Sequence, residues 1–242
     1  MVKNILRRSA SAPVTVPAQV RGRIDIPPVV VLGLGRFGAS LAAELTSHGV
    51  EVLGMDSDAH LVQGCTDFLT EAAVGDTTDR ETLVQFGVHE IGRVVLGIGS
   101  NLEASILTAS NLVDLGVPDI WAKADSDAHA KILTQVGVHH VVRPERDTGR
   151  RVAHLLGGRF KEFVEFDENY GMIRVSVPDR FAGTAVDLDR LWARDRVRGV
   201  SVRAGDGAWE PWVSGRKLSG DEQLIVAGTP ADLEAFVGGR RR

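Results

Sequence analysis

The chain has 242 residues, 43% of them hydrophobic and 25% charged, and its formal net charge is −4. This composition is typical of a globular protein, and it excludes wholesale disorder and a globally basic chain that binds nucleic acid through its charge. No apolar run approaches the roughly 18 residues that span a bilayer, and the single cysteine, Cys65, allows no disulfide within the chain, as is typical of a reducing compartment.

The first segment, residues 1–27, is predicted to be a basic leader. It contains five basic residues against one acid, Asp25, and its prolines interrupt any helix. We expect this leader to be disordered. An organelle transit peptide is the alternative, because the segment contains arginine and serine and is poor in acids.

Residues 28–157 alternate between short apolar runs and amphipathic stretches. Most of the runs are rich in Val and Ile and short enough for strands buried on both faces. They predict a Rossmann-like, doubly wound parallel sheet in an α/β domain, which includes a linking helix that starts near Pro144. The predicted strands are Val29–Leu32, Glu51–Met55, Glu71–Val74, Arg93–Ile98, Ile120–Lys123 and His139–Val142, and examples of the predicted helices are Arg36–Ser47, Asp79–Phe86 and Asn101–Leu115.

Residues 158–238 follow a different pattern, which predicts a small α+β domain. Two strand candidates are separated by a loop of turn-forming residues, 167–171, and this arrangement predicts a hairpin. The predicted strands are Phe160–Phe166, Met172–Val177, Val197–Arg203 and Gln223–Ala227, and the predicted helices are Asp187–Trp192 and Asp232–Val237.

A glycine motif, Gly33–Gly38, follows the first predicted strand and opens a helix. In a dinucleotide-binding fingerprint, Gly33 makes the tight turn, Gly35 lets the backbone approach a pyrophosphate, and Gly38 lets the helix pack close to the strand. Asp56 ends the second strand, where a carboxylate binds the ribose hydroxyls and repels a 2′-phosphate, which argues against NADP. The alternative is a structural glycine turn with Asp56 as a cap.

Arg36 and Phe37 lie inside this motif. An arginine at a helix N-terminus is unfavourable with the helix dipole unless an anion is present. Arg36 could therefore reach a β- or γ-phosphate, which favours ATP or ADP as the ligand. A solvated surface arginine is the alternative interpretation.

Further polar residues follow the later strands at the carboxyl edge of the predicted sheet. Asp76 and Thr77 follow the third strand, Ser100 and Asn101 follow the fourth, and Lys123 ends the fifth. Ligands bind at this edge in open α/β sheets. The carboxylate of Asp76 could accept from an adenine amino group or cap the next helix, and the pattern leaves both roles open.

The sequence contains no recognisable catalytic constellation. Tyr170 has Arg174 rather than a lysine four residues on, Cys65 has no evident base partner, and the histidines form no metalloprotease motif. Glu145 opens the linking helix, where acids usually serve only the helix dipole, although a pair of Glu145 side chains from twofold-related subunits would bind a divalent cation. A nucleotide site without catalytic groups indicates a sensor.

Several segments resemble one known family, the cytosolic KtrA/TrkA-type subunits of bacterial potassium-uptake systems. These subunits carry an RCK (regulator of potassium conductance) N-domain and a smaller RCK C-domain, and the resemblance covers residues 29 to about 237. It rests most firmly on the GRFG motif and the later PERDTG motif. The segments are Val31–Gly38, Gly99–Ser105, Ile120–Ala124, Arg143–Gly149 and, more loosely, Gly220–Val226.

The resemblance implies a homodimer that assembles into an octameric ring at the cytoplasmic face of the membrane, docked on a membrane-embedded potassium-translocating subunit. It implies ATP or ADP, and sometimes NAD(H), at the fingerprint, with Arg36 near the γ-phosphate. It also implies a divalent cation, Mg or Ca, between Glu145 and its dimer mate. The chain departs from the family where Arg143 replaces a common histidine and where Asp76 stands for the asparagine of some relatives.

Three functions are compatible with these patterns. The leading hypothesis is a nucleotide-gated regulatory subunit without enzymatic activity. The alternative is an NAD-dependent oxidoreductase, with Lys123 or a histidine as proton donor. A stand-alone sensor without a channel is the third.

Overall fold

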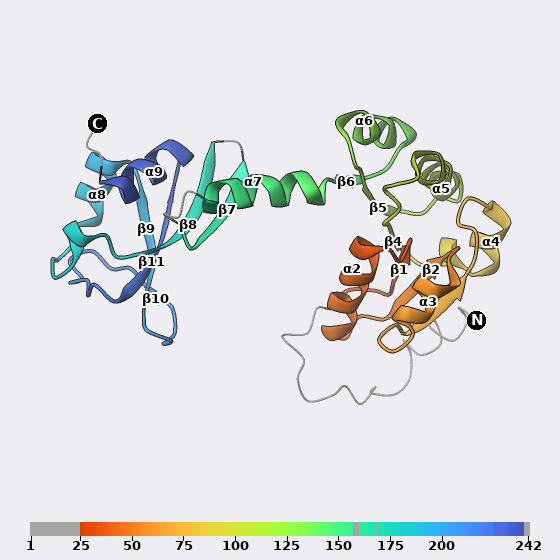
Figure 1. Ribbon diagram of the computed structural model, residues 1–242, viewed down its shortest axis with the longest axis horizontal. Coiled ribbons are helices and arrows are strands. Elements are labelled where there is room, and N and C mark those ends of the chain that lie inside the picture. The colour runs from red at the N-terminus through yellow and green to blue at the C-terminus, as the bar shows by residue number, and fades with distance from the viewer. Residues whose placement is uncertain (1–24, 157–159, 168, 240–242) are drawn as a thin grey trace. The chain divides into compact units, whose positions relative to one another are not determined.

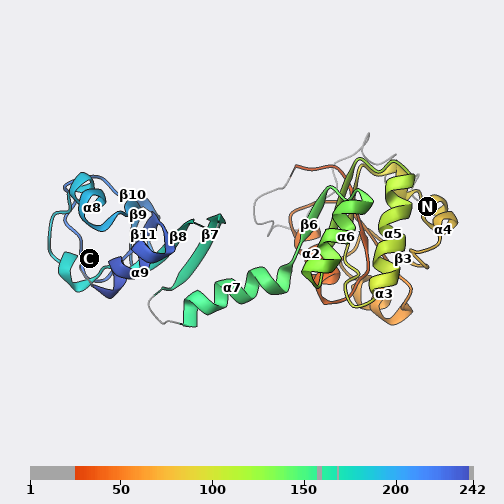
Figure 2. The same ribbon diagram turned by 90° about the horizontal axis from the view of Figure 1, so that it is seen from above.

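A computed structural model describes residues 25–156, 160–167 and 169–239. Contacts between Cα atoms divide the chain into two compact units, Met1–Pro144 and Glu145–Arg242 (Figures 1 and 2). Most of the predicted basic leader lies outside the described residues. Within the described residues, no helix is both long enough and apolar enough to cross a membrane.

The first unit is built on a six-stranded, fully parallel sheet, which confirms the predicted fold class. The strand order is β3-β2-β1-β4-β5-β6, so the chain winds outward from β1 in both directions. This order brings the carboxyl ends of β1 and β4 side by side at the point where the winding reverses. The strands are β1 (Val29–Leu32), β2 (Val52–Asp56), β3 (Glu71–Val74), β4 (Arg93–Leu96), β5 (Asp119–Lys123) and β6 (His140–Val142).

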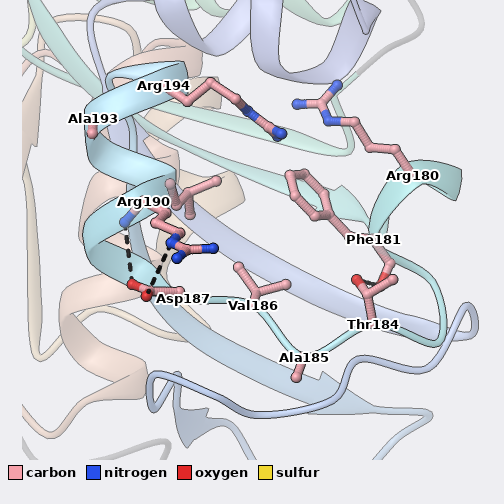
Figure 3. A pocket seen from close by; sticks show the side chains of 10 residues that line it. Arg180, Phe181, Thr184, Ala185, Val186, Asp187, Arg190, Ala193 and Arg194 are labelled. Atoms are coloured by element: carbon pink, nitrogen blue, oxygen red, sulfur yellow. Dashed lines mark hydrogen bonds and ion pairs between the residues drawn. The ribbon is translucent and has the colours of Figure 1, made fainter.

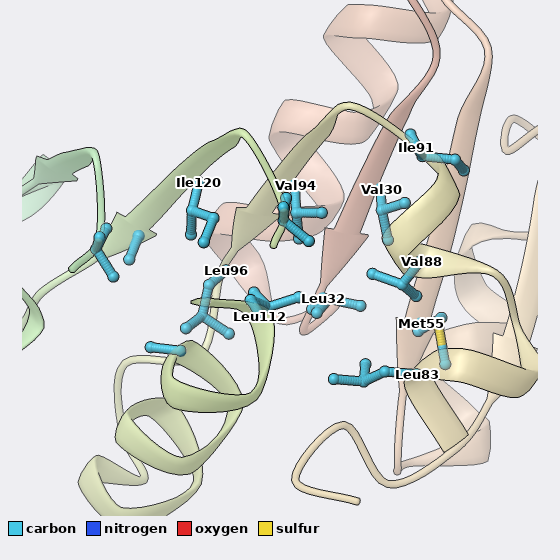
Figure 4. Close-up of a cluster of buried hydrophobic side chains, with 14 of the residues drawn as sticks. Val30, Leu32, Met55, Leu83, Val88, Ile91, Val94, Leu96, Leu112 and Ile120 are labelled. Carbon is cyan, nitrogen blue, oxygen red and sulfur yellow. The ribbon is translucent and has the colours of Figure 1, made fainter. Parts of the chain in front are cut away.

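Alternating side chains of β1 enter two separate cores. Val30 and Leu32 pack on one face of the sheet with Leu112 (Figure 4), while Val29 and Val31 pack on the other face with Ala42. All four β1 residues are buried, which explains the continuous apolar run of a strand covered on both sides. Helices α4 (Arg80–Gln85), α5 (Leu102–Asp114) and α6 (Asp127–Val136) contribute to the first core, and α2 (Arg36–Ser47) and α3 (Ala59–Cys65) contribute to the second.

Most α-helices of the first unit begin at side-chain caps. Asp58, Asp79, Asn101 and Ser126 each accept a hydrogen bond from a backbone N–H of the helix that follows. Helix α2 instead begins after Gly35, which has no side chain to offer. The helices are α2 (Arg36–Ser47), α3 (Ala59–Cys65), α4 (Arg80–Gln85), the 3₁₀-helix η1 (Val88–Glu90), α5 (Leu102–Asp114) and α6 (Asp127–Val136).

Strand β4 ends at Leu96 rather than at the predicted Ile98. Gly97 leaves the strand with its N–H bonded to the carbonyl of Leu32, and a Cβ on Gly33 would lie 2.8 Å from the Ile98 side chain. The two apolar-looking residues therefore form the loop beside the glycine motif. The second strand also ends one residue later than predicted, at Asp56.

The second unit contains helix α7 and a five-stranded antiparallel sheet, in the order β10-β9-β11-β8-β7. The predicted hairpin is present as β7 and β8. The short strand β10 was not predicted. The elements are α7 (Pro144–Leu156), β7 (Glu162–Asp167), β8 (Tyr170–Ser176), η2 (Asp179–Phe181), α8 (Leu188–Asp195), β9 (Arg198–Ala204), β10 (Glu210–Pro211), β11 (Glu222–Gly228) and α9 (Pro230–Gly238).

One face of this second sheet is apolar and buried, and the other is more exposed and carries both polar and apolar side chains. Ile173 and Leu224 lie in a core that includes Leu191 of α8 and Phe236 of α9. Their sequence neighbours point the other way, where Gln223 accepts hydrogen bonds at 3.1 Å from two arginines, Arg174 and Arg203. Burial thus alternates along β8 and over residues 222–226 of β11, because the core covers one face of the sheet.

The two compact units divide at Pro144, whereas the predicted domain boundary is residue 157. Helix α7 is grouped with the second unit, and its ion pairs Arg150–Glu165 and Arg151–Glu162 connect it to β7. The expected domains, 28–157 and 158–238, remain predictions about the family's domain limits.

Candidate nucleotide site

The glycine motif forms a tight turn between β1 and α2. Gly33 has a φ of +90°, and its N–H donates to the carbonyl of Met55 at 2.7 Å. A Cβ on Gly38 would overlap the carbonyl oxygen of Gly33 and lie 3.3 Å from the Val31 side chain. Both positions therefore need glycine for the backbone alone, whether or not a ligand binds.

Gly35 has a different environment. Its φ of −63° is accessible to any residue, and a Cβ there would meet no atom within 4 Å. The packing of the described residues therefore does not explain the missing side chain. The open space lies at the start of α2, a helix with neither a side-chain cap nor an acid in its first turn, so its positive end is available to an anion.

Arg36 is the first residue of α2 and is exposed. Within the described residues it has no ion-pair partner, so its charge is not neutralised by them. An uncompensated cation at the positive end of a helix dipole is unfavourable on its own. A phosphate at this position would relieve that repulsion.

Asp56 lies at the carboxyl end of β2, next to the glycine turn. Its Oδ2 accepts the N–H of Leu34 at 2.7 Å and its Oδ1 accepts the N–H of Asp58 at 2.9 Å. These bonds fix the carboxylate beside the motif, and each oxygen keeps a further lone pair for a hydroxyl donor. Burial raises the pKa of the Cys65 thiol, and the Asp56 carboxylate raises it further.

The sequence left open whether Asp76 binds adenine or caps the next helix, and the loop after β3 shows which residue is the cap. Asp79 caps α4 by accepting from Glu81 and Thr82. Asp76 closes a local turn, accepting from the N–H and the hydroxyl of Thr78 at 2.9 and 2.7 Å, and is exposed. Asp76 is therefore not the cap of this helix, and its second oxygen is available at the sheet edge.

Thr77 does not contribute its side chain to this edge. Its hydroxyl is buried and lies 3.1 Å from the hydroxyl of Thr108 on α5. The side chain holds the loop to α5 and faces the interior. The prediction that Thr77 binds a ligand therefore concerns only the backbone of this residue.

The loops after β4 and β5 carry the remaining predicted residues. Ser100 is exposed, and the side chain of Asn101 caps α5 by accepting from Ala104 at 3.0 Å. Lys123 has a largely covered side chain, and its Nζ lies 3.1 Å from Oδ1 of Asp125. The lysine is thus oriented by a neighbouring carboxylate.

Glu145 belongs to the second unit, in the first turn of α7, and is exposed. Its neighbour Arg143 forms an ion pair with Asp127 at the start of α6. Within the described residues, no group of three or more His, Cys, Asp and Glu side chains could hold a metal ion. The divalent cation between Glu145 and its dimer mate remains a prediction.

A separate pocket of about 590 Å³ lies in the second unit (Figure 3). Its three arginines are paired with carboxylates of the same unit: Arg180 and Arg194 with Asp195, and Arg190 with Asp187. The predicted site residues lie elsewhere and do not line this pocket.

The residues that support Lys123 were not predicted from the sequence. Asp125 orients the lysine, and the buried His129 lies behind Asp125 with its Nε2 3.1 Å from the hydroxyl of Ser105. No motif marks Asp125 or His129, and Ser105 lies in a segment of the family resemblance but had no role assigned to it. The available signal was a polar residue at an apolar position on each of two helices that face each other, His129 and Ser105.

Comparisons with known proteins place this geometry in a family. Residues 29–144 match the model of the TrkA-N domain. The chain is 35% identical over 208 residues to Ktr system potassium uptake protein C of Bacillus subtilis (strain 168), covering 85% of this chain and 94% of that protein. It is 34% identical over 174 residues to Ktr system potassium uptake protein A of Vibrio alginolyticus, covering 71% and 77%. The chain therefore belongs to the KtrA/TrkA family of potassium uptake proteins.

Solved structures share the fold. The GsuK RCK domain matches with a TM-score of 0.61 at 17% identity, covering 98% of this chain and 52% of that one. The GsuK channel bound to NAD matches with a TM-score of 0.60 at 17% identity, covering 100% and 44%. This chain thus spans about half the length of the GsuK chains that it matches.

Proposed function

We propose that the first unit binds a nucleotide, ADP or ATP in preference to NAD(H), and that binding regulates potassium uptake through a membrane-embedded partner. The observation that carries the proposal is the open space over Gly35 at the uncapped start of α2, beside Arg36, whose charge is unpaired among the described residues. This end of the helix offers backbone N–H groups and positive charge to phosphates, and no packing requirement of the described residues accounts for the glycine.

The other groups suit the rest of a nucleotide. In this proposal Asp56 accepts from the ribose hydroxyls, Asp76 accepts from the adenine amino group, and Lys123, Ser100 and Asn101 line the same sheet edge. Arg36 contacts the β- or γ-phosphate. A GsuK channel with the same fold is described as bound to NAD, which supports a nucleotide at this fold but leaves its identity in this chain to experiment.

Regulation, rather than catalysis, is the second part of the proposal. Nucleotides act by binding two conformations of the assembly with different affinities, which shifts the population between them. The assembly is a homodimer-based octameric ring, peripheral to the cytoplasmic face of the membrane, in which Glu145 and its dimer mate hold a divalent cation. The names of the related Ktr system potassium uptake proteins support the potassium-translocating partner.

Calorimetric titration of the purified chain with ADP, ATP and NADH tests the binding step. We expect saturable binding of at least ADP and ATP, and weaker binding by Arg36→Ala, most markedly for ATP. Absence of binding to all three nucleotides, or an Arg36→Ala variant with unchanged affinities, would contradict the proposal. Steady oxidation of NADH with a small substrate would instead favour an oxidoreductase.

A further inference from the structure

Behind the candidate nucleotide site, a buried histidine joins two helices and one loop. His129 lies in the first turn of α6 with only 2% of its surface exposed, and Ser105 of α5 is fully buried. The imidazole Nε2 lies 3.1 Å from the Ser105 hydroxyl, and the imidazole Nδ1 lies 3.4 Å from the backbone nitrogen of Asp125. The ring thus connects α5 to the loop between β5 and α6.

The Asp125 N–H fixes the tautomer of this histidine. Because a backbone N–H can only donate, Nδ1 of His129 must accept, and the proton is therefore on Nε2, from which it is donated to Ser105. Burial lowers the pKa of His129, with Asp125 acting in the opposite direction, so the ring is neutral at pH 7. A neutral ring can accept at one nitrogen and donate at the other, whereas a protonated ring would lose the bond to Asp125.

The Asp125 side chain reaches the candidate site from this anchored position. One carboxylate oxygen is 3.1 Å from Nζ of Lys123. The carboxylate also occupies the space over Gly99, since a Cβ built there would lie 2.7 Å from Oδ2 and closer still to Oδ1. One anchored residue therefore both contacts Lys123 and confines the loop that leads to Ser100 and Asn101.

We propose that His129 is a positioning residue of the nucleotide site, which acts through the Asp125 backbone to hold Lys123 and the β4–α5 loop in the ligand-binding arrangement. This inference rests on the proposed function. His129 itself is buried beneath the loops and makes no contact with the ligand.

Two substitutions separate the two hydrogen bonds of the ring. In His129→Asn, the amide oxygen takes the place of Nδ1, and the bond from the Asp125 N–H is kept. In His129→Gln, the amide nitrogen takes the place of Nε2, and only the bond to Ser105 is kept. Ser126→Ala is the matched control, because it removes the cap of the same helix, including the 3.0 Å bond to the His129 N–H, and leaves the imidazole bonds in place.

ADP affinity of the full chain, measured by calorimetry, gives the functional readout. We expect His129→Gln to raise the Kd about tenfold, a change on the scale of one lost hydrogen bond, and His129→Asn and Ser126→Ala to stay within about twofold of the wild type. Equal losses in the Gln and Asn variants, or wild-type affinity in His129→Gln, would overturn the positioning role. Wild-type protein that binds no ADP, ATP or NADH would overturn the proposed function as well.

Two ligand-free measurements keep the test decisive if a variant folds poorly. Hydrogen exchange at the Asp125 amide should accelerate in His129→Gln and not in His129→Asn or Ser126→Ala. In the wild type, nitrogen chemical shifts of the imidazole should show a proton on Nε2 and none on Nδ1 at pH 7. A proton on Nδ1, or an Asp125 amide insensitive to both substitutions, would contradict the proposal.

Discussion

At the residue scale, Gly35 and Gly38 are glycines for opposite reasons. A side chain at Gly38 would overlap the Gly33 carbonyl, so this glycine is required by the packing of α2 on the turn. A side chain at Gly35 would meet only open space, and the backbone angles there suit any residue. The fingerprint motif predicts different roles for the two positions, and the surroundings of Gly38 show the packing role directly.

The substitutions Gly38→Ala and Gly35→Ala turn this difference into a prediction. Gly38→Ala should lower the free energy of unfolding by about 1–3 kcal/mol or more, as overpacked sites do. Gly35→Ala should leave stability within about 0.5 kcal/mol of the wild type and abolish nucleotide binding, because the methyl group fills the space proposed for the phosphates. Urea unfolding and calorimetry measure the two effects. A destabilised Gly35→Ala variant, or one that still binds, would show that this space has another role.

His129 should make the stability of the first unit depend on pH. Its pKa is lowered in the folded state, mainly by burial, so below the unfolded value of about 6.5 the unfolded chain binds the proton more readily. The contribution is therefore stabilising at neutral pH, and it decreases as the pH falls from about 6.5 toward the lower folded-state pKa. Urea unfolding between pH 7.5 and 5 should show a steeper loss for the wild type than for His129→Asn. The same pH dependence of stability in the wild type and in His129→Asn would contradict a lowered pKa of His129 in the folded state.

At the element scale, the predicted strands and helices of the first unit were largely correct because most strands are buried on two faces and most helices have a polar start. The sequence could not show that β4 stops at Leu96, since Gly97 and Ile98 continue its apolar run and leave it only to accommodate the glycine turn. The sequence could predict those residues of the candidate site that belong to one short motif. Its support by Asp125 and His129 depends on contacts between α5 and α6, which no single segment encodes.

The loop after β3 gives a matched pair of substitutions. Asp79→Ala removes the cap of α4, whose bonds to Thr82 and Glu81 also lower the pKa of the Asp79 carboxyl, so this variant should unfold at a lower temperature than the wild type. Asp76→Ala removes only an exposed local turn. It should change the melting temperature less and weaken adenine nucleotide binding. Circular dichroism melts and calorimetry provide both readouts, and the reverse pattern of effects would contradict the roles of Asp79 as a cap and Asp76 as a ligand-binding residue.

At the scale of the whole molecule, the residues predicted to bind a nucleotide lie in the first unit and Glu145 lies in the second. The two units have separate hydrophobic cores: β1, β2 and β4 supply much of the two cores of the first unit, and β8, β11, α8 and α9 supply much of the core of the second. The proposed nucleotide site and the proposed cation site therefore lie in different units of the chain.

A fragment that ends at Pro144 should therefore fold and bind ADP. We expect a cooperative unfolding transition and a Kd within about fivefold of that of the full chain, since the fragment keeps both cores of the first unit. Calorimetry and thermal unfolding of the fragment measure this. A folded fragment without affinity would place part of the nucleotide site in the second unit.

In the proposed function, a nucleotide at the start of α2 controls potassium uptake. Potassium flux into proteoliposomes that contain the membrane partner and the purified chain tests it most directly, with ATP, ADP or no nucleotide present. We predict that flux with the wild type changes with the nucleotide and that flux with Gly35→Ala does not, although the variant is folded. A wild-type flux that is the same under all three conditions would contradict the claim.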